Sequence, residues 1–122
     1  MYEQVSRKED LELHCERLTI DPNGFLVDNP EGSFLIRVQG DSMAGAGILP
    51  GDLLVVDSSI NAEIGNIIIA EVNKKLTLKR LIKNNGSVML QPENSSYKPI
   101  TIRKMDKFSI RGVVKYVIRD YV

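Results

Sequence analysis

The sequence predicts one mostly β domain with little helix. Three observations lead to this prediction: short runs rich in β-branched residues recur from residue 33 onward, turn-forming residues separate them, and no amphipathic pattern of three helical turns appears in that part. The chain has 122 residues, of which 43% are hydrophobic, so it is long enough to bury one packed core.

Seven runs are expected to form strands, and the turns between them follow from residue type. Asn73-Lys74 and Asn85-Gly86 each separate two strand-like runs. Asparagine and glycine tolerate a positive φ, so both places predict β-hairpins. The last run is expected to bend near Gly112. The expected strands cover residues 34–38, 53–57, 67–72, 75–83, 87–91, 100–102 and 108–119.

The first part of the chain differs from the rest. Residues 1–24 are polar and charged, and we expect them to form an extended or partly helical arm before a domain of residues 25–122. Residues 1–31 carry eight acidic and three basic side chains, whereas residues 98–122 carry seven basic and two acidic ones. Opposed charges predict that the arm docks on the tail, within one chain or across a homodimer. Two unrelated solvated surfaces are the alternative.

Several classes of protein are excluded by composition. Cys15 and His14 are the single cysteine and histidine, too few for an internal disulfide or a Cys/His zinc site. As neighbours they usually point in different directions, so we do not expect them to form a nucleophile and base. We expect no metal and no cofactor. The N-terminus lacks a signal-peptide pattern, and no apolar run approaches the roughly 18 residues of a membrane span, which predicts a cytoplasmic protein.

A glycine-rich segment follows the first expected strand of the domain. Residues 40–51 hold four of the nine glycines, and Ser42 lies near their start. Glycines let the backbone bend sharply and approach a ligand closely. A serine at such a junction can project its hydroxyl into a site where backbone N–H groups face a developing oxyanion. The alternative is a serine that caps a tight turn through local hydrogen bonds.

A nucleophilic serine needs a base, and lysine is the best candidate here. His14 lies in the polar arm, which makes a Ser-His-Asp triad improbable. A lysine acts as a base only when neutral, and an apolar environment favours that form. Lys79 has the most apolar neighbours of any lysine, and Lys115 ranks second. A lysine that covers the sheet with its aliphatic stem is the alternative.

Several of these segments, in their order, resemble the self-cleaving UmuD and LexA-type proteins of the SOS response. The resemblance extends over roughly residues 25–118, and several ordered motifs at matching spacing are more specific than any one of them. The matching segments are residues 40–43 (GDSM), 50–57, 65–70, 76–81, 90–100 and 112–114.

The resemblance implies a fold, an activity and partners. The fold would be the folded β-sheet of LexA and signal peptidase. Ser42 would be the nucleophile, Lys79 the general base, and the backbone N–H groups of Ser42 and Met43 the oxyanion donors. Such proteins cut their own chain at an Ala-Gly or Cys-Gly bond, stimulated by RecA on single-stranded DNA. Shortened UmuD is a homodimer that joins a UmuC-like translesion DNA polymerase.

No Ala-Gly or Cys-Gly bond precedes Ser42, so the sequence is similar to the shortened form of UmuD. Three hypotheses follow. The first is a UmuD-like accessory subunit of an error-prone polymerase, which the segment 97–100 and the short arm favour. The second is the peptidase domain of a LexA-type or phage repressor without its DNA-binding domain. The third is an interaction module whose dyad is idle. A net charge of zero argues against direct DNA binding.

Overall fold

The computed structural model describes residues 13–16 and 31–121, and within them the chain is mostly β-structure. The eight strands form one antiparallel sheet in the order β1-β2-β3-β8-β4-β5-β6-β7. A single turn of 3-10 helix, η2 (Ala44–Ala46), lies between β2 and β3. The predicted fold class is therefore confirmed. The strands are β1 (Leu13–Glu16), β2 (Ser33–Val38), β3 (Leu53–Asp57), β4 (Ile67–Val72), β5 (Lys75–Asn84), β6 (Ser87–Gln91), β7 (Ile100–Thr101) and β8 (Phe108–Ile118).

The two hairpins occur where the sequence predicts them. Asn73 and Lys74 have φ values of 50° and 72°, and they connect β4 to β5. Asn85 and Gly86, with φ values of 52° and 80°, connect β5 to β6. A positive φ at both central residues gives a turn whose twist matches that of the flanking strands, so the hairpins fix the register of β5 against β4 and β6.

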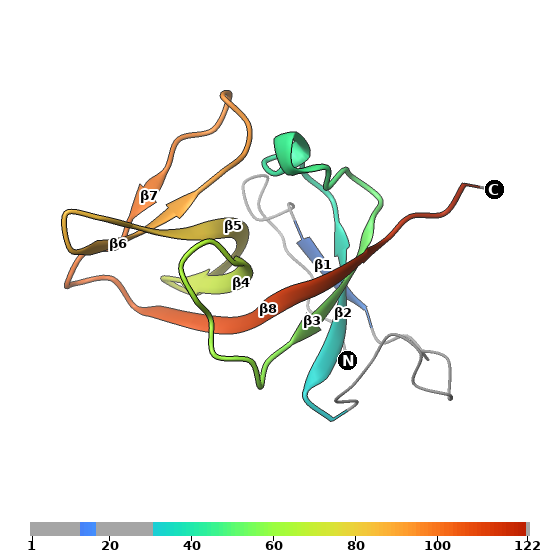
Figure 1. Cartoon of the computed structure of the whole chain (residues 1–122), viewed down its shortest axis with the longest axis horizontal. Helices are drawn as coiled ribbons and strands as arrows, with labels where there is room; N and C mark the ends of the chain where they lie inside the picture. Colours follow the sequence, from blue (N-terminus) through green and yellow to red (C-terminus); the bar gives the residue numbers. More distant parts are fainter. Residues whose placement is uncertain (1–12, 17–30, 122) are drawn as a thin grey trace.

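Strand β8 joins two halves of the sheet, as Figure 1 shows. Its C-terminal part pairs with β3 and its N-terminal part with β4, and Val113 pairs with residues of both. The register of the β4–β8 pair shifts between Ile69 and Ala70, next to Gly112. A Cβ atom at Gly112 would lie 2.6 Å from Cγ1 of Val56. A glycine is therefore needed where β8 passes closely over β3.

The largest core cluster brings the two halves together. Its buried residues come from β2 and β3 in one half, from β4 and β5 in the other, and from the connection between β2 and β3. Burial of this apolar surface is the main force that fixes how the sheet folds. The cluster therefore sets the distance between the β2–β3 connection and β5. It contains Ile36, Val38, Met43, Ile48, Leu54, Val56, Ile69 and Leu78.

Part of the expected arm is described. Residues of β1 pair with β2, so that Cys15 lies opposite Ile36 and His14 opposite Arg37. The remainder of residues 1–24, and the arm's expected docking on the basic tail, lie outside the described residues. Within the part of the chain that the structure describes, no helix is long and apolar enough to cross a membrane.

Candidate active site

Ser42 lies in the connection between β2 and β3, which we call the serine loop (residues 39–52). The loop is closed at its base by two hydrogen bonds, from Val38 N–H to the Asp52 carbonyl (2.9 Å) and from Gly51 N–H to the Val38 carbonyl (2.7 Å). Met43, beside Ser42, is buried in the largest core cluster. This apolar side chain anchors the loop to the core, and Ser42 is itself only 1% exposed.

Lys79 lies inside β5, where it pairs with Ile68 of β4. It is 4% exposed, which is unusual for a lysine. Side chains two residues apart in a strand share a face of the sheet, so Thr77 lies beside Lys79. The Lys79 Nζ donates a hydrogen bond to Thr77 Oγ1 at 2.6 Å. This bond fixes the direction of the lysine side chain.

The fold brings Ser42 and Lys79 together across 37 positions of the sequence. The Lys79 Nζ donates to Ser42 Oγ at 3.3 Å, and Ser42 Oγ contacts the Leu78 carbonyl at 3.5 Å. Lys115, the second lysine that the sequence suggested, lies on β8 with its Nζ 5.7 Å from the ring centre of Tyr116. Of the two lysines, Lys79 is therefore the one placed against the serine.

A hydroxyl and an amine in this arrangement can exchange a proton. Both groups are buried, so little water competes for their hydrogen bonds or screens charge that develops there. When the amine is neutral, its lone pair can accept the serine proton, which makes the oxygen a nucleophile. The geometry fits covalent catalysis by Ser42 with Lys79 as base.

The peptide groups next to Ser42 complete the site. The N–H groups of Ala44, Gly45, Ala46 and Gly47 all donate to carbonyls of the protein. In contrast, the N–H groups of Ser42 and Met43 have no acceptor among residues 13–16 and 31–121. Buried N–H groups are rarely left without a partner. These two amides are thus the donors beside Ser42 that no group in the described part of the chain accepts from.

An ion pair supports the far side of the serine loop. The Arg119 guanidinium donates to both carboxylate oxygens of Asp52, at 2.7 and 2.6 Å, and to the Gly47 carbonyl at 2.6 Å. The Leu49 N–H also donates to Asp52, at 2.8 Å. The Arg119 hydrogen bonds lower the pKa of Asp52, although burial opposes them, and the same pair raises the pKa of Arg119. The charged pair therefore ties the end of β8 to the loop.

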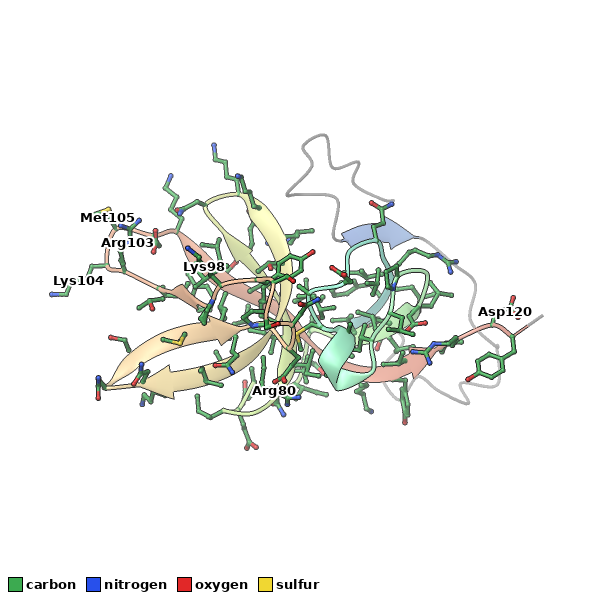
Figure 2. All side chains as sticks on the ribbon, turned by 90° about the horizontal axis from the view of Figure 1, so that it is seen from above. Arg80, Lys98, Arg103, Lys104, Met105 and Asp120 are labelled. Carbon is green, nitrogen blue, oxygen red and sulfur yellow. The ribbon has the colours of Figure 1, made fainter. Side chains whose placement is uncertain are left out.

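Contacts from a second loop were missed by sequence reasoning. The Glu93 N–H donates to the Ser42 carbonyl at 2.9 Å, and the Glu93 carboxylate pairs with Arg80 at 2.9 Å. Arg80, which is labelled in Figure 2, follows Lys79 on β5. A local pattern could have revealed Thr77, which lies two residues before Lys79. No local signal links residue 93 to residue 42.

Known proteins match most of this chain. The family model described as Peptidase S24-like matches residues 3–115. The chain is similar to the LexA repressors of Bordetella pertussis (39% identity over 87% of this chain and 48% of the relative) and Shewanella woodyi (39%, over 97% and 55%). It is also similar to that of Syntrophotalea carbinolica (44%, over 72% and 44%). The chain spans about half the length of these relatives.

Proposed function

Because this chain belongs to the Peptidase S24-like family, we propose that it is a serine peptidase domain of the SOS-response type, with Ser42 as nucleophile and Lys79 as general base. The contact between the two buried groups, 3.3 Å from Nζ to Oγ, carries the proposal. The alternative in which the serine caps a turn accounts for the loop but not for a buried lysine directed at its hydroxyl.

The proposed reaction proceeds through an acyl-enzyme. The Ser42 oxygen attacks the carbonyl carbon of a peptide bond while its proton passes to neutral Lys79. The N–H groups of Ser42 and Met43 donate to the oxyanion that forms. When the C–N bond breaks, Lys79 returns the proton to the leaving amine. Lys79 then takes a proton from the water that attacks the ester, and it returns this proton to the Ser42 oxygen as the ester bond breaks.

We propose a substrate from the same class of proteins. The relatives are LexA repressors, so the favoured assignment is a LexA-type peptidase domain that cuts an Ala-Gly or Cys-Gly bond. Residues 1–41 hold no such bond, so the proposal is tested on a bond of this kind in a separate chain. Stimulation by RecA on single-stranded DNA, a homodimeric state and a cytoplasmic location belong to the same proposal.

A UmuD-like accessory role in translesion synthesis is the second candidate. It is favoured by the segment 97–100 (YKPI), which resembles that of UmuD. Binding to the catalytic subunit of a UmuC-like polymerase, and longer bypass products on a damaged template, are expected if this role holds. A chain that neither binds the polymerase nor changes bypass would contradict it.

Cleavage in trans tests the assignment as a LexA-type peptidase domain. The substrate is a full-length LexA repressor whose own nucleophile has been replaced by alanine, incubated with this chain with and without RecA filaments. We expect the cleavage rate to increase at alkaline pH, because the fraction of a lysine amine that is neutral rises with pH. Ser42→Ala should abolish it.

Ser58→Ala is the matched control. Ser58 also follows a strand, but its hydroxyl donates to the Gly32 carbonyl at 2.7 Å. Its replacement should leave cleavage unchanged. Absence of cleavage by the wild-type chain at any pH would favour the third hypothesis, an interaction module with an idle dyad.

A further inference from the structure

Two neighbouring carbonyls of the serine loop are held by one segment of another loop. Residues 92–99, which connect β6 to β7, form what we call the clamp loop. Its Asn94 side chain donates through Nδ2 to the Asp41 carbonyl at 2.9 Å. Its Glu93 N–H donates to the Ser42 carbonyl at 2.9 Å, and Gly45 N–H donates back to the Glu93 carbonyl at 2.7 Å.

These bonds determine where two amides point. A peptide group is planar and trans, so its C=O and N–H point in opposite directions. The Asp41 carbonyl belongs to the peptide group that carries the Ser42 N–H. The Ser42 carbonyl belongs to the group that carries the Met43 N–H. Holding the two carbonyls therefore fixes the two N–H groups that lack an acceptor within the described residues.

Asn94 is the part of this arrangement that a substitution can remove. Glu93 acts through its backbone, which every residue except proline would supply. The Asn94 side chain has two defined partners, since its Oδ1 accepts from Ser96 N–H at 2.9 Å while its Nδ2 donates to Asp41. A donor on one side and an acceptor on the other leave only one orientation of the amide group.

Tyr97 provides a contrast within the same loop. Its hydroxyl donates to the carboxylate of Asp41 at 2.7 Å. This bond holds the Asp41 side chain and does not act on the Asp41–Ser42 peptide group, whose carbonyl accepts from Asn94 Nδ2 and, at 3.1 Å, from the Ala44 N–H. Tyr97 and Asn94 thus contact the same residue, but only Asn94 acts on the peptide plane.

We propose that Asn94 is a positioning residue for the peptidase reaction: its side-chain amide, together with the Ala44 N–H, fixes the Asp41–Ser42 peptide plane so that the Ser42 N–H faces the oxyanion. The inference rests on the proposed function and extends it to a residue outside the serine loop. A fixed donor stabilises developing charge without reorganising during the reaction, which is where electrostatic catalysis gains most.

Asn94→Asp is the sharpest test. It keeps an oxygen for Ser96 N–H but replaces the donor with an oxygen that repels the Asp41 carbonyl. Under single-turnover conditions in the trans assay, we expect the limiting rate to fall about 10- to 100-fold, with the half-saturating substrate concentration within about twofold of wild type. Asn94→Ala should lower the limiting rate in the same way, and it decides the question if Asn94→Asp does not fold.

Two control variants separate the effect from charge and from general loosening of the loop. Ser95→Asp places a carboxylate on the exposed neighbouring residue. Tyr97→Phe removes the bond to the Asp41 side chain. Both should keep the limiting rate within about threefold of wild type. An equal loss in either control, or a change confined to the half-saturating concentration in Asn94→Asp, overturns the inference.

A measurement without substrate distinguishes failure of the inference from failure of the proposed function. In NMR spectra, the ¹⁵N resonance of an amide responds to hydrogen bonds accepted by the carbonyl of the same peptide group. We expect the Ser42 resonance to move in Asn94→Asp and Asn94→Ala, but much less in Tyr97→Phe. If the wild type does not cleave, the proposed function fails. The Ser42 ¹⁵N resonances of the variants then decide by themselves whether Asn94 holds the Asp41–Ser42 peptide group. Equal shifts in all three variants overturn the inference.

Discussion

Lys79 lies inside a ten-residue strand, whereas Ser42 lies in a loop. Strand β5 is hydrogen-bonded to β4 on one side and β6 on the other, so its register alone places Lys79 opposite Ile68. The serine loop is held differently. Besides the short-range bonds at its base, several of its polar contacts come from Glu93, Asn94 and Arg119, which lie more than 45 positions away from their partners in the chain.

The difference shows which half of the dyad is more easily disturbed. Many parallel contacts fix a residue within a sheet, and no single one is decisive. A loop held by a few long-range hydrogen bonds can move when one of them is lost. Replacement of Lys79 should therefore lower the cleavage rate because the amine is lost, while the strand stays in place. Substitutions around Ser42 should lower the rate because they move the Ser42 hydroxyl and its neighbouring amides.

The largest effect should come from the lysine itself. Lys79→Met keeps the length of the side chain and removes the base, so trans cleavage should fall about 10³-fold or more. The Tm of Lys79→Met should not fall, because methionine is an apolar side chain at a buried position. This outcome would mean that the sheet holds position 79 without the amine. Lys115→Met is the matched control and should cleave like wild type. Retention of more than about a tenth of the rate in Lys79→Met would contradict the base role.

An intermediate effect is expected from the contact between the two loops. A Cβ atom at Gly45 would lie 2.5 Å from the Glu93 carbonyl oxygen, so Gly45→Ala must push the clamp loop away from Ser42. We expect cleavage to fall about tenfold.

Gly47→Ala is the control for that change. Gly47 has open space around its missing Cβ but a φ of +86°. The substitution should cost about 1 kcal/mol of unfolding free energy through backbone strain, with less loss of rate. A larger rate loss in Gly47→Ala than in Gly45→Ala would show that the loop's own conformation matters more than the clamp.

The smallest effect concerns the ion pair at the far side of the serine loop. The pKa of Asp52 is lowered in the folded chain, chiefly by hydrogen bonds from Arg119. Its stabilising contribution is therefore fully present above the unfolded-state pKa, near 3.8, and is lost as the pH falls through the lower folded-state pKa. Arg119→Met should lower the Tm at pH 7, and this difference from wild type should begin to shrink below about pH 4 and disappear below the folded-state pKa of Asp52.

Comparison of the two proteins at each pH isolates the pair. Asp106 also has a lowered pKa, mainly through a hydrogen bond from Asn73, and it adds acid sensitivity to both. Only the difference between wild type and Arg119→Met reports on Asp52. A difference that is independent of pH would mean that Arg119 acts through packing alone.

The seven strands after residue 32 were predicted well because they are local features, whereas β1 was not predicted as a strand. Runs of β-branched residues and the two positive-φ turns appear in the sequence, and the structure confirms hairpins at Asn73-Lys74 and Asn85-Gly86. Lys79 was identified from its apolar neighbours, and the structure places it beside Ser42. Its role as base stays a prediction, as do the roles of the Ser42 and Met43 amides.

The sequence alone determined the elements, the turns and the two residues of the candidate dyad, because burial pattern and backbone preference act over a few neighbouring positions. Only the tertiary structure decided how the serine loop is held. Asn94 and Asp41 lie 53 positions apart, and neither stands out within its own segment. Their contact exists because the apolar core folds β2–β3 onto β4–β5, and polar groups brought together in this way must find partners.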